Sequence, residues 1–361
     1  MINPVSHIAN MASYALADLS PPMGKKLISL AQNESLRPPA PSVVEALKDA
    51  AVLPQVYPDP DWTELRHALA SLHDLDAAQV LCGNGSLDLI GCLARAYLSP
   101  QASALAPRHA YPFFRTSTLM TGARFDVAEE KHLCADVGAL LAAVQPDTKI
   151  LFLANPGNPT GTRLSGNDLR QLRDQLSEDI LLVIDEAYGE FADHLGERLF
   201  DLVENENTIV LRTLSKAYGL AGQRVGWGAF PVPVLAEVRK VMNPNNVALS
   251  GQKAANAALL DQVYMHETCS QTMRIRDRFI EQMRALGLVV PDSYTNFALL
   301  CFASRARAMQ VDQALQAEGV FLRAQAGAGL NDCLRATVGS LENMDLVAEL
   351  IEDALTKEVP R

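Results

Sequence analysis

The chain has 361 residues, of which 48% are hydrophobic and 20% are charged, a globular composition with material for about two domains. Its 31 Lys and Arg against 42 Asp and Glu give a net charge of −11, which excludes a general nucleic-acid binder. Six cysteines without a CxxC pair or zinc-like spacing exclude a disulfide scaffold and predict reduced, buried thiols and no metal site.

The first twenty residues contain no basic start followed by an apolar run, so they do not resemble a secretory signal. The longest apolar stretches, such as residues 181–184, are far shorter than the roughly 20 residues of a membrane helix. We therefore expect a cytoplasmic protein that binds no membrane.

Helix and strand signals alternate between about residues 42 and 245. Residues 42–45 and 61–64 have the pattern of capping boxes that open two helices. Five short apolar runs then have the length of buried parallel strands, at residues 79–82, 102–106, 150–154, 180–184 and 208–211. Helical spacing between these runs predicts an α/β domain with a mostly parallel sheet.

The pattern changes after about residue 245. Long helices are predicted over residues 250–286, and a last helix begins at residue 341. Three strand-like runs lie between them, at residues 297–302, 320–323 and 333–338, with a helix between the first two. We therefore expect a large domain of residues 42–245 and a smaller α+β domain formed by residues 1–41 and 246–361.

Ligands of open α/β sheets gather at the carboxyl ends of the strands, and four predicted strand ends have unusual sequences. The first, Cys-Gly-Asn-Gly-Ser at residues 82–86, precedes a helix whose free N–H groups favour an anion. Asp88 occupies the third glycine position of a dinucleotide fingerprint, which excludes a nicotinamide dehydrogenase of that type. The second, Asn-Pro-Gly-Asn-Pro-Thr-Gly at residues 155–161, predicts a rigid loop whose two amides hydrogen-bond a ligand.

The other two strand ends contain ionisable groups. Asp185 leaves an apolar strand within Asp-Glu-Ala-Tyr, and its burial requires a cation. Residues 213–227 place Lys216 beside Ser215, with Arg224 eight residues further on among glycines that permit close approach. At a strand end with the other three segments, Lys216 is a candidate functional amine.

These four segments, together with Tyr-Pro-Asp-Pro-Asp at residues 57–61 and Cys-Leu-Arg-Ala-Thr-Val-Gly at 333–339, resemble fold-type I pyridoxal-phosphate-dependent aminotransferases. Within that superfamily the chain is most similar to the histidinol-phosphate aminotransferase group. The resemblance covers nearly the whole chain. It implies an aspartate-aminotransferase-like large domain, a smaller α+β domain and pyridoxal 5'-phosphate as the cofactor.

The resemblance also implies roles for the residues at the strand ends. Lys216 would hold the cofactor as a Schiff base and move protons, and Asp185 would pair with its pyridine nitrogen. Asn158 and Tyr188 would hydrogen-bond the cofactor's phenolic oxygen, and Tyr111 would stack on its ring.

The same resemblance assigns the groups that bind anions. The residues expected around the cofactor phosphate are Gly85, Ser86, Ser215, Arg224 and, from the other subunit of a homodimer with a shared active site, Tyr57. Arg335 would hold the substrate α-carboxylate, because guanidinium and carboxylate form bidentate pairs. Arg323 and Tyr14 would contact a distal substrate phosphate, and Asn33 belongs to an N-terminal substrate loop.

Two positions depart from the pattern of this group. Leu87 replaces an acidic residue, and residues 33–36 are Asn-Glu-Ser-Leu instead of Asn-Glu-Asn-Pro. The second departure lies near the expected substrate entrance and leaves a different amino donor open. Other conspicuous residues are expected in the scaffold: Trp62, Trp227 and Met242 in the core, and His67, His73, His132, His194 and His266 at the surface without metal spacing.

The leading hypothesis is transfer of an amino group between an L-amino acid or amino-alcohol phosphate and 2-oxoglutarate. Histidinol phosphate is the first candidate donor and aromatic amino acids are the next. The alternative is a pyridoxal-phosphate-dependent decarboxylase of the phosphothreonine type, which needs mainly a different orientation about Cα. A transcriptional regulator would need a DNA-binding module, for which the chain has neither spare length nor basic charge.

Overall fold

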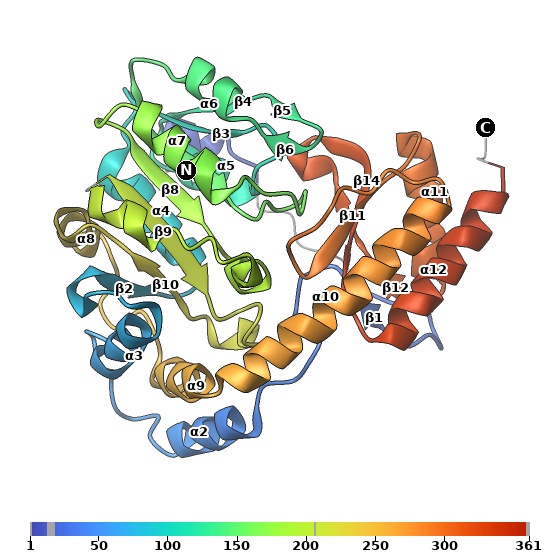
Figure 1. Ribbon diagram of the computed structural model, residues 1–361, viewed down its shortest axis with the longest axis horizontal. Helices are drawn as coiled ribbons and strands as arrows, with labels where there is room; N and C mark the ends of the chain where they lie inside the picture. Colours follow the sequence, from blue (N-terminus) through green and yellow to red (C-terminus); the bar gives the residue numbers. More distant parts are fainter. Residues whose placement is uncertain (1, 13–18, 206, 359–361) are drawn as a thin grey trace.

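The computed structural model describes residues 2–12, 19–205 and 207–358. Tyr14 lies outside these ranges. Figure 1 shows a larger part built around a central sheet and a smaller part beside it. The long helix α10 (Gln262–Ala285) runs from one part to the other.

The central sheet confirms the predicted parallel architecture. Its seven strands lie in the order β2-β10-β9-β8-β7-β3-β4, and every neighbouring pair that excludes β10 is parallel. The strands are β2 (Val80–Gly83), β10 (Gly226–Ala229), β9 (Thr208–Thr213), β8 (Leu181–Asp185), β7 (Thr148–Ala154), β3 (Ser103–Pro107) and β4 (Arg124–Ala128). All residues of β8 and β9 are buried, which is why these strands are almost continuously apolar.

Two strands of this sheet were not predicted. The edge strand β4 has exposed and half-buried residues at most positions, so it lacks an apolar run. Strand β10 is antiparallel to both neighbours and has two glycines among four residues. A Cβ atom at Gly226 would lie 2.0 Å from the Ser86 nitrogen. Close packing against this backbone therefore requires glycine at position 226, so the strand has no apolar side chain there to predict it.

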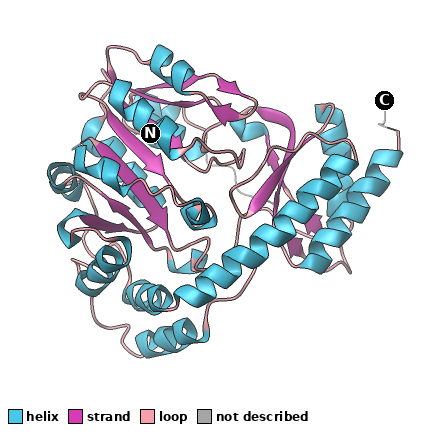
Figure 2. Ribbon diagram, in the orientation of Figure 1, coloured by secondary structure: helices cyan, strands magenta, loops and turns pink. Residues whose placement is uncertain are grey.

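Helices cover both faces of the sheet (Figure 2). The helices of the larger part are α2 (Pro41–Ala51), α3 (Thr63–His73), α4 (Ser86–Tyr97), α5 (Pro112–Leu119), α6 (Val137–Ala143), α7 (Gly166–Gln175), α8 (Val232–Arg239) and α9 (Leu249–Leu260), and the short α1 (Ser6–Ala9) precedes them. A two-stranded hairpin, β5 (Glu130–Lys131) with β6 (Cys134–Ala135), follows β4.

The helices expected after residues 42 and 61 are present, but both predicted capping boxes are wrong. Helix α2 begins at Pro41, and no side chain caps it. Proline has no N–H group, so its place at the first helical position leaves one fewer N–H group that needs a partner. At the start of α3, the Asp59 carboxylate accepts the backbone N–H groups of Asp61 and Thr63. The capping side chain therefore lies earlier in the turn than the pattern predicted.

The smaller part joins residues from both ends of the chain. Its antiparallel sheet has the order β11 (Phe297–Cys301), β14 (Leu330–Thr337) and β13 (Arg323–Gln325), packed with α11 (Arg305–Ala317) and α12 (Leu341–Thr356). Near the N-terminus, β1 (Ile28–Ser29) pairs in parallel with β12 (Val320–Phe321). The sequence boundaries of the two domains stay a prediction.

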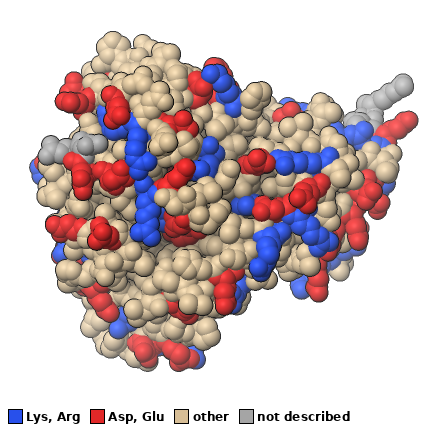
Figure 3. Space-filling model, in the orientation of Figure 1, with Lys and Arg blue, Asp and Glu red and all other residues tan. Residues whose placement is uncertain are grey.

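Two large clusters of buried apolar side chains stabilise these parts. The larger surrounds the seven-stranded sheet, and a second lies among α10, α11, α12 and β14. Trp62 and Trp227 are buried in the first cluster and Met242 packs against it, as expected for scaffold residues. In the described part of the chain no helix is both long and apolar enough to cross a membrane. Figure 3 shows acidic and basic side chains interspersed over the face that it draws.

The surface prediction is wrong for one histidine. His73 is half-buried, with its ring 4.8 Å from that of Trp227 and 5.2 Å from that of Phe200. Burial and the nearby Arg212 lower the pKa of His73 to about 3, so the ring is neutral and packs as an aromatic group. The other four histidines that were expected at the surface are exposed: His67, His132, His194 and His266.

Candidate active site

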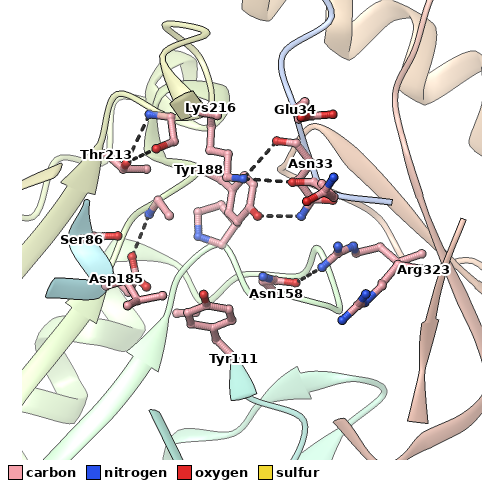
Figure 4. Close-up of a pocket in the computed structure, with 18 of the residues that line it drawn as sticks. Asn33, Glu34, Ser86, Tyr111, Asn158, Asp185, Tyr188, Thr213, Lys216 and Arg323 are labelled. Carbon is pink, nitrogen blue, oxygen red and sulfur yellow. Dashed lines mark hydrogen bonds between the residues drawn. The ribbon is translucent and has the colours of Figure 1, made fainter. Parts of the chain in front are cut away.

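A cavity of about 500 Å³ lies at the carboxyl ends of β7, β8 and β9, where the larger part faces the N-terminal segment and the smaller sheet. Most of the predicted site residues line it: Asn33, Ser86, Tyr111, Asn158, Asp185, Tyr188, Ser215, Lys216, Arg224, Arg323 and Arg335. Figure 4 shows how side chains from both parts converge on this space. The size suits a small organic molecule.

Lys216 follows β9 and extends into the cavity beside Tyr188 (Figure 4). Its Nζ donates to the carbonyl oxygen of Asn33 at 3.1 Å and to that of Gln32 at 3.4 Å. Burial, followed by the positive charges of Arg335 and Arg224, lowers the pKa of Lys216 to about 8. The amine is therefore much easier to deprotonate than an exposed lysine, which suits a nucleophile or a base.

Asp185 is the last residue of β8, and its carboxyl group is buried. One carboxyl oxygen accepts the backbone N–H of Ala187 at 3.1 Å. Burial raises the pKa of Asp185 to about 7, and the nearby Lys216 opposes this shift. A cationic group placed beside this carboxyl would favour its ionised form.

The neighbouring Glu186 belongs to a separate buried ion cluster. Its carboxylate accepts a hydrogen bond of 2.9 Å from Arg212 Nε, and Asp193 accepts two further bonds from the same guanidinium. Because successive strand residues point to opposite faces, Asp185 lines the cavity while Glu186 anchors the segment from behind.

Tyr188 is linked to both ends of the chain through Asn33. Asn33 Nδ2 donates to the phenolic oxygen of Tyr188 at 2.7 Å, and Thr337 Oγ1 donates to Asn33 Oδ1 at 3.1 Å. The backbone N–H of Asn33 also donates to Thr337 Oγ1 at 2.9 Å. Asn296 Nδ2 holds the backbone of this turn by donating to the carbonyl oxygens of Asn33 and Glu34. Asn33 therefore orients Tyr188 instead of standing alone at the cavity wall.

The two asparagines of the 155–161 loop have different roles. Asn158 lines the cavity, and its side-chain oxygen accepts a hydrogen bond of 2.6 Å from Arg335 Nη1. The side chain of Asn155 instead bonds to the backbone N–H and carbonyl of Leu164, which closes the loop. The expectation that both amides face a ligand is therefore wrong for Asn155.

Arg335 and Arg323 lie side by side on neighbouring strands. They are direct partners in the antiparallel register of β14 and β13. Arg335 Nη2 donates to the carbonyl oxygen of Ala31 at 2.8 Å, which links this strand to the N-terminal segment. Two guanidinium groups at one wall of the cavity favour an anionic ligand.

An anion cup, formed by Gly85, Ser86, Ser215 and Arg224, lies at the start of α4. Helix α4 begins at Ser86, with Gly85 at its N-cap in a conformation of positive φ, 79°. Arg224 Nη1 lies 3.5 Å from Ser215 Oγ, and a Cβ atom at Gly85 would be 2.6 Å from Arg224 Nη2. Free helix N–H groups, a hydroxyl and a guanidinium together suit a phosphate.

Among the described residues, Gly85 and Tyr57 were predicted to belong to the site but do not line the cavity itself. Tyr57, in the loop between α2 and α3, is 87% exposed and is not a lining residue. Tyr14 lies outside the described residues. Within the described ranges there is also no group of three or more His, Cys, Asp or Glu side chains that could hold a metal ion.

Sequence reasoning missed the residues that support the site from behind. Thr337 and Asn296 were not singled out, although both determine the position of Asn33. A signal for Thr337 existed, because it lies two residues after Arg335 and therefore on the same face of β14. No comparable local pattern marks Asn296.

Comparison with known proteins adds independent information. Residues 25–351 match the family described as aminotransferase class I and II. A protein of Rhodospirillum centenum named histidinol-phosphate aminotransferase is 38% identical over 96% of this chain and 97% of its own length. A protein of the same name from Paramagnetospirillum magneticum is 40% identical over 91% of this chain and 92% of its own length.

Solved structures agree with this result. The histidinol-phosphate aminotransferase of Sinorhizobium meliloti, solved in complex with pyridoxal-5'-phosphate, has a TM-score of 0.86 and 31% identity, covering 91% of this chain and 90% of that one. An aspartate aminotransferase mutant of Thermus thermophilus has a TM-score of 0.80 at 21% identity, covering 92% of each chain, and so shares the fold. The chain therefore belongs to the aminotransferase class I and II family.

Proposed function

We propose that this chain is a pyridoxal-phosphate-dependent aminotransferase that moves the amino group of histidinol phosphate to 2-oxoglutarate. The observation that carries the proposal is the meeting of Lys216 and Asp185 in one cavity between an anion cup and a pair of arginines. Relatives named histidinol-phosphate aminotransferase, similar along almost the whole chain, support this donor.

The residues of the cavity fit this cofactor. The buried Asp185 carboxyl, with its raised pKa, needs a nearby cation, and a protonated ring nitrogen is such a group. The anion cup offers helix N–H groups and the side chains of Ser215 and Arg224 to the phosphate. When bound, pyridoxal phosphate supplies an aldehyde that takes up the amino group and a ring that withdraws electrons from the substrate Cα.

The protein's own groups then have distinct tasks in this proposal. Lys216 Nζ would hold the cofactor and, once free, would take a proton from the substrate Cα and return one to it in the reverse half-reaction. Tyr188 and Asn158 would hydrogen-bond the phenolic oxygen of the cofactor, and Tyr111 would stack on its ring; all three residues line the cavity. The lowered pKa of Lys216 supports its role as a base near neutral pH.

The paired arginines support an anionic donor and acceptor. An amino-alcohol phosphate has one dianionic group and no α-carboxylate, whereas 2-oxoglutarate has two carboxylates. Adjacent Arg335 and Arg323 each present a planar guanidinium group, and such groups bind either carboxylate or phosphate. In this proposal Arg335 binds the α-carboxylate and Arg323 the distal anion.

The donor is tested by a half-reaction assay. The cofactor-loaded enzyme is mixed with histidinol phosphate, histidinol, phenylalanine, tyrosine and phosphothreonine, and cofactor absorbance and released carbon dioxide are followed. The proposal expects rapid conversion to pyridoxamine phosphate with histidinol phosphate and recovery on addition of 2-oxoglutarate. Faster conversion with phenylalanine or tyrosine would show that an aromatic amino acid, and not histidinol phosphate, is the preferred donor. Release of carbon dioxide from phosphothreonine would favour the decarboxylase.

We also propose a homodimer in which Tyr57 of each subunit reaches the cofactor phosphate of the other. The exposed Tyr57 and the neighbouring exposed Val52 and Val56 support this interface. Mixing Lys216→Ala and Tyr57→Ala subunits tests it, because each hybrid dimer would contain one intact site. Random mixing should restore up to about a quarter of wild-type activity, whereas activity no higher than that of the separate variants would contradict a shared site.

The cellular location is also a proposal. All six cysteines are free. Free thiols are typical of proteins in a reducing compartment, which supports the cytoplasm.

A further inference from the structure

The six cysteines are not equivalent. Burial raises the pKa of Cys82, Cys92, Cys134 and Cys269. Cys301 differs, because a hydrogen bond from the Cys333 thiol lowers its pKa, while the pKa of Cys333 is raised. The first four thiols are therefore harder to ionise than an exposed cysteine, whereas the thiolate of Cys301 is favoured.

Cys301 and Cys333 lie opposite each other on adjacent antiparallel strands. Cys301 ends β11, its register partner on β14 is Cys333, and the two sulfur atoms are 3.0 Å apart. Opposed residues of such strands have Cα atoms roughly 4.5–5.5 Å apart, within the range of roughly 4.4–6.8 Å that a disulfide spans. The backbone therefore already has the geometry that joining the two sulfurs requires.

Solvent access distinguishes the two thiols. Cys301 is partly exposed, whereas Cys333 is 3% exposed and packs with Leu299 and Leu330. A small reagent can therefore reach Cys301 first, and the buried Cys333 thiol lies next to it. Cys134 is a useful contrast, because it is also partly exposed but has a raised pKa and contacts the carbonyl oxygen of Arg163.

We propose that Cys301 and Cys333 form a reversible thiol-modification site that is oxidised by low-molecular-weight disulfides such as oxidised glutathione. The Cys301 thiolate attacks one sulfur of the reagent, forms a mixed disulfide and releases one thiol. The mixed disulfide removes the Cys301 thiolate, which is the largest cause of the raised pKa of Cys333. The Cys333 thiol then gives up its proton, attacks Cys301 Sγ, forms the protein disulfide and releases the second thiol. Two protein thiols are oxidised, one reagent disulfide is reduced, and the two thiol protons leave on the released molecules.

The site does not depend on the proposed function. It nevertheless lies next to the candidate active site, since Arg335 follows Cys333 by two residues on the same face of β14. Leu299, two residues before Cys301, is the register partner of Arg335. Oxidation would thus cross-link the two strands beside an anion-binding arginine.

The experiment uses the reduced, full-length, cofactor-loaded protein treated with oxidised glutathione. The intact mass of the treated protein, measured without reductant, should be lower than that of the reduced protein by two hydrogens. Dithiothreitol should restore the original mass. Tryptic peptides 285–305 and 324–335 should appear as one cross-linked species. Cys134→Ser should behave like the wild type, and Cys301→Ser should show no change in mass.

A second variant separates the two steps. Cys333→Ser should stop after the first exchange and gain the mass of one glutathione at Cys301, which also shows that this variant presents Cys301 normally. The proposal is overturned if wild-type protein keeps all six thiols. It is also overturned if the glutathione attaches to Cys134, or if Cys301→Ser still loses two hydrogens.

Discussion

Asn33 donates a hydrogen bond of 2.7 Å to the phenolic oxygen of Tyr188, although the two residues are 155 positions apart in the chain. Both side chains are buried, and Thr337 holds the other end of the Asn33 amide. The bond therefore joins the N-terminal segment, the large sheet and strand β14 at one point of the cavity.

Replacing Asn33 with alanine should weaken both stability and turnover. The change leaves buried Tyr188 and Thr337 hydroxyls without this partner, at a cost of about 1–3 kcal/mol in the free energy of unfolding. We expect turnover to fall roughly tenfold if the phenol is displaced by a comparable energy. Thr337→Val should act in the same direction and Thr337→Ser should not, as measured by urea unfolding and steady-state kinetics. Equal effects of Val and Ser would mean that the hydroxyl has no part in the link.

The lowered pKa of Lys216 predicts the pH dependence of cofactor binding. With a pKa of about 8, the neutral, nucleophilic amine increases as pH rises from 7 to 9. The rate at which apo-protein captures pyridoxal phosphate, followed by absorbance, should rise through pH 8 and then level off. A rate that continues to rise to pH 10 would indicate an ordinary exposed lysine.

The same shift predicts how the stability of the apo-protein changes with pH. The folded pKa of Lys216 lies below the ordinary value of 10.5, so between about pH 8 and 10.5 the unfolded chain binds more protons. Burial of the charged amine therefore destabilises the fold most below pH 8. Lys216→Met should be more stable than wild type there by about 1–3 kcal/mol, and the difference should shrink as pH rises to 10.5. Chemical unfolding at pH 7 and pH 10 measures this difference.

The two arginines predict different substrate effects. Arg323→Ala should raise KM on the order of tenfold for donors with a distal anion, since a charge-assisted hydrogen bond contributes about 1.5–3 kcal/mol, and should spare plain donors. Arg335→Lys should weaken every substrate with an α-carboxylate, because lysine cannot form the bidentate pair. KM values for phosphorylated and plain donors provide the comparison. Equal losses for both classes at Arg323 would remove histidinol phosphate as the leading donor.

Close packing under the anion cup predicts a strong effect at one glycine. A Cβ atom at Gly226 would lie 2.0 Å from the Ser86 nitrogen and 2.3 Å from the Gly85 carbonyl carbon. Gly226→Ala should therefore displace the start of α4, lower stability by about 1–3 kcal/mol or more and weaken cofactor binding. Gly327→Ala is the matched control, because no atom lies within 4 Å of its added Cβ. Thermal unfolding and cofactor titration of both variants test the difference.

Much of the larger part could be predicted because its strands are buried on both faces. Each such strand needs a run of apolar residues, and β7, β8 and β9 have one. Strand β10 lacks this local signal. A side chain at Gly226 would collide with the backbone of Gly85 and Ser86, and one at Gly228 would collide with Leu211, Phe230 and Val210. The error at His73 has the same origin, because its ring is buried by packing against Trp227 and Phe200, which are distant in the sequence.

The amino-acid order alone determined which groups at the strand ends could take part: Lys216, Asp185 at a strand exit, a glycine-bounded turn and Arg224. Local apolar periodicity reports burial, and parallel strands bring their carboxyl ends to a common edge, so these groups could be expected together. Tertiary structure alone decided that Asn155 closes a loop while Asn158 faces the cavity, that Asn33 holds Tyr188, and that Cys301 meets Cys333. Such partnerships depend on packing between segments far apart in the chain, and no local pattern encodes them.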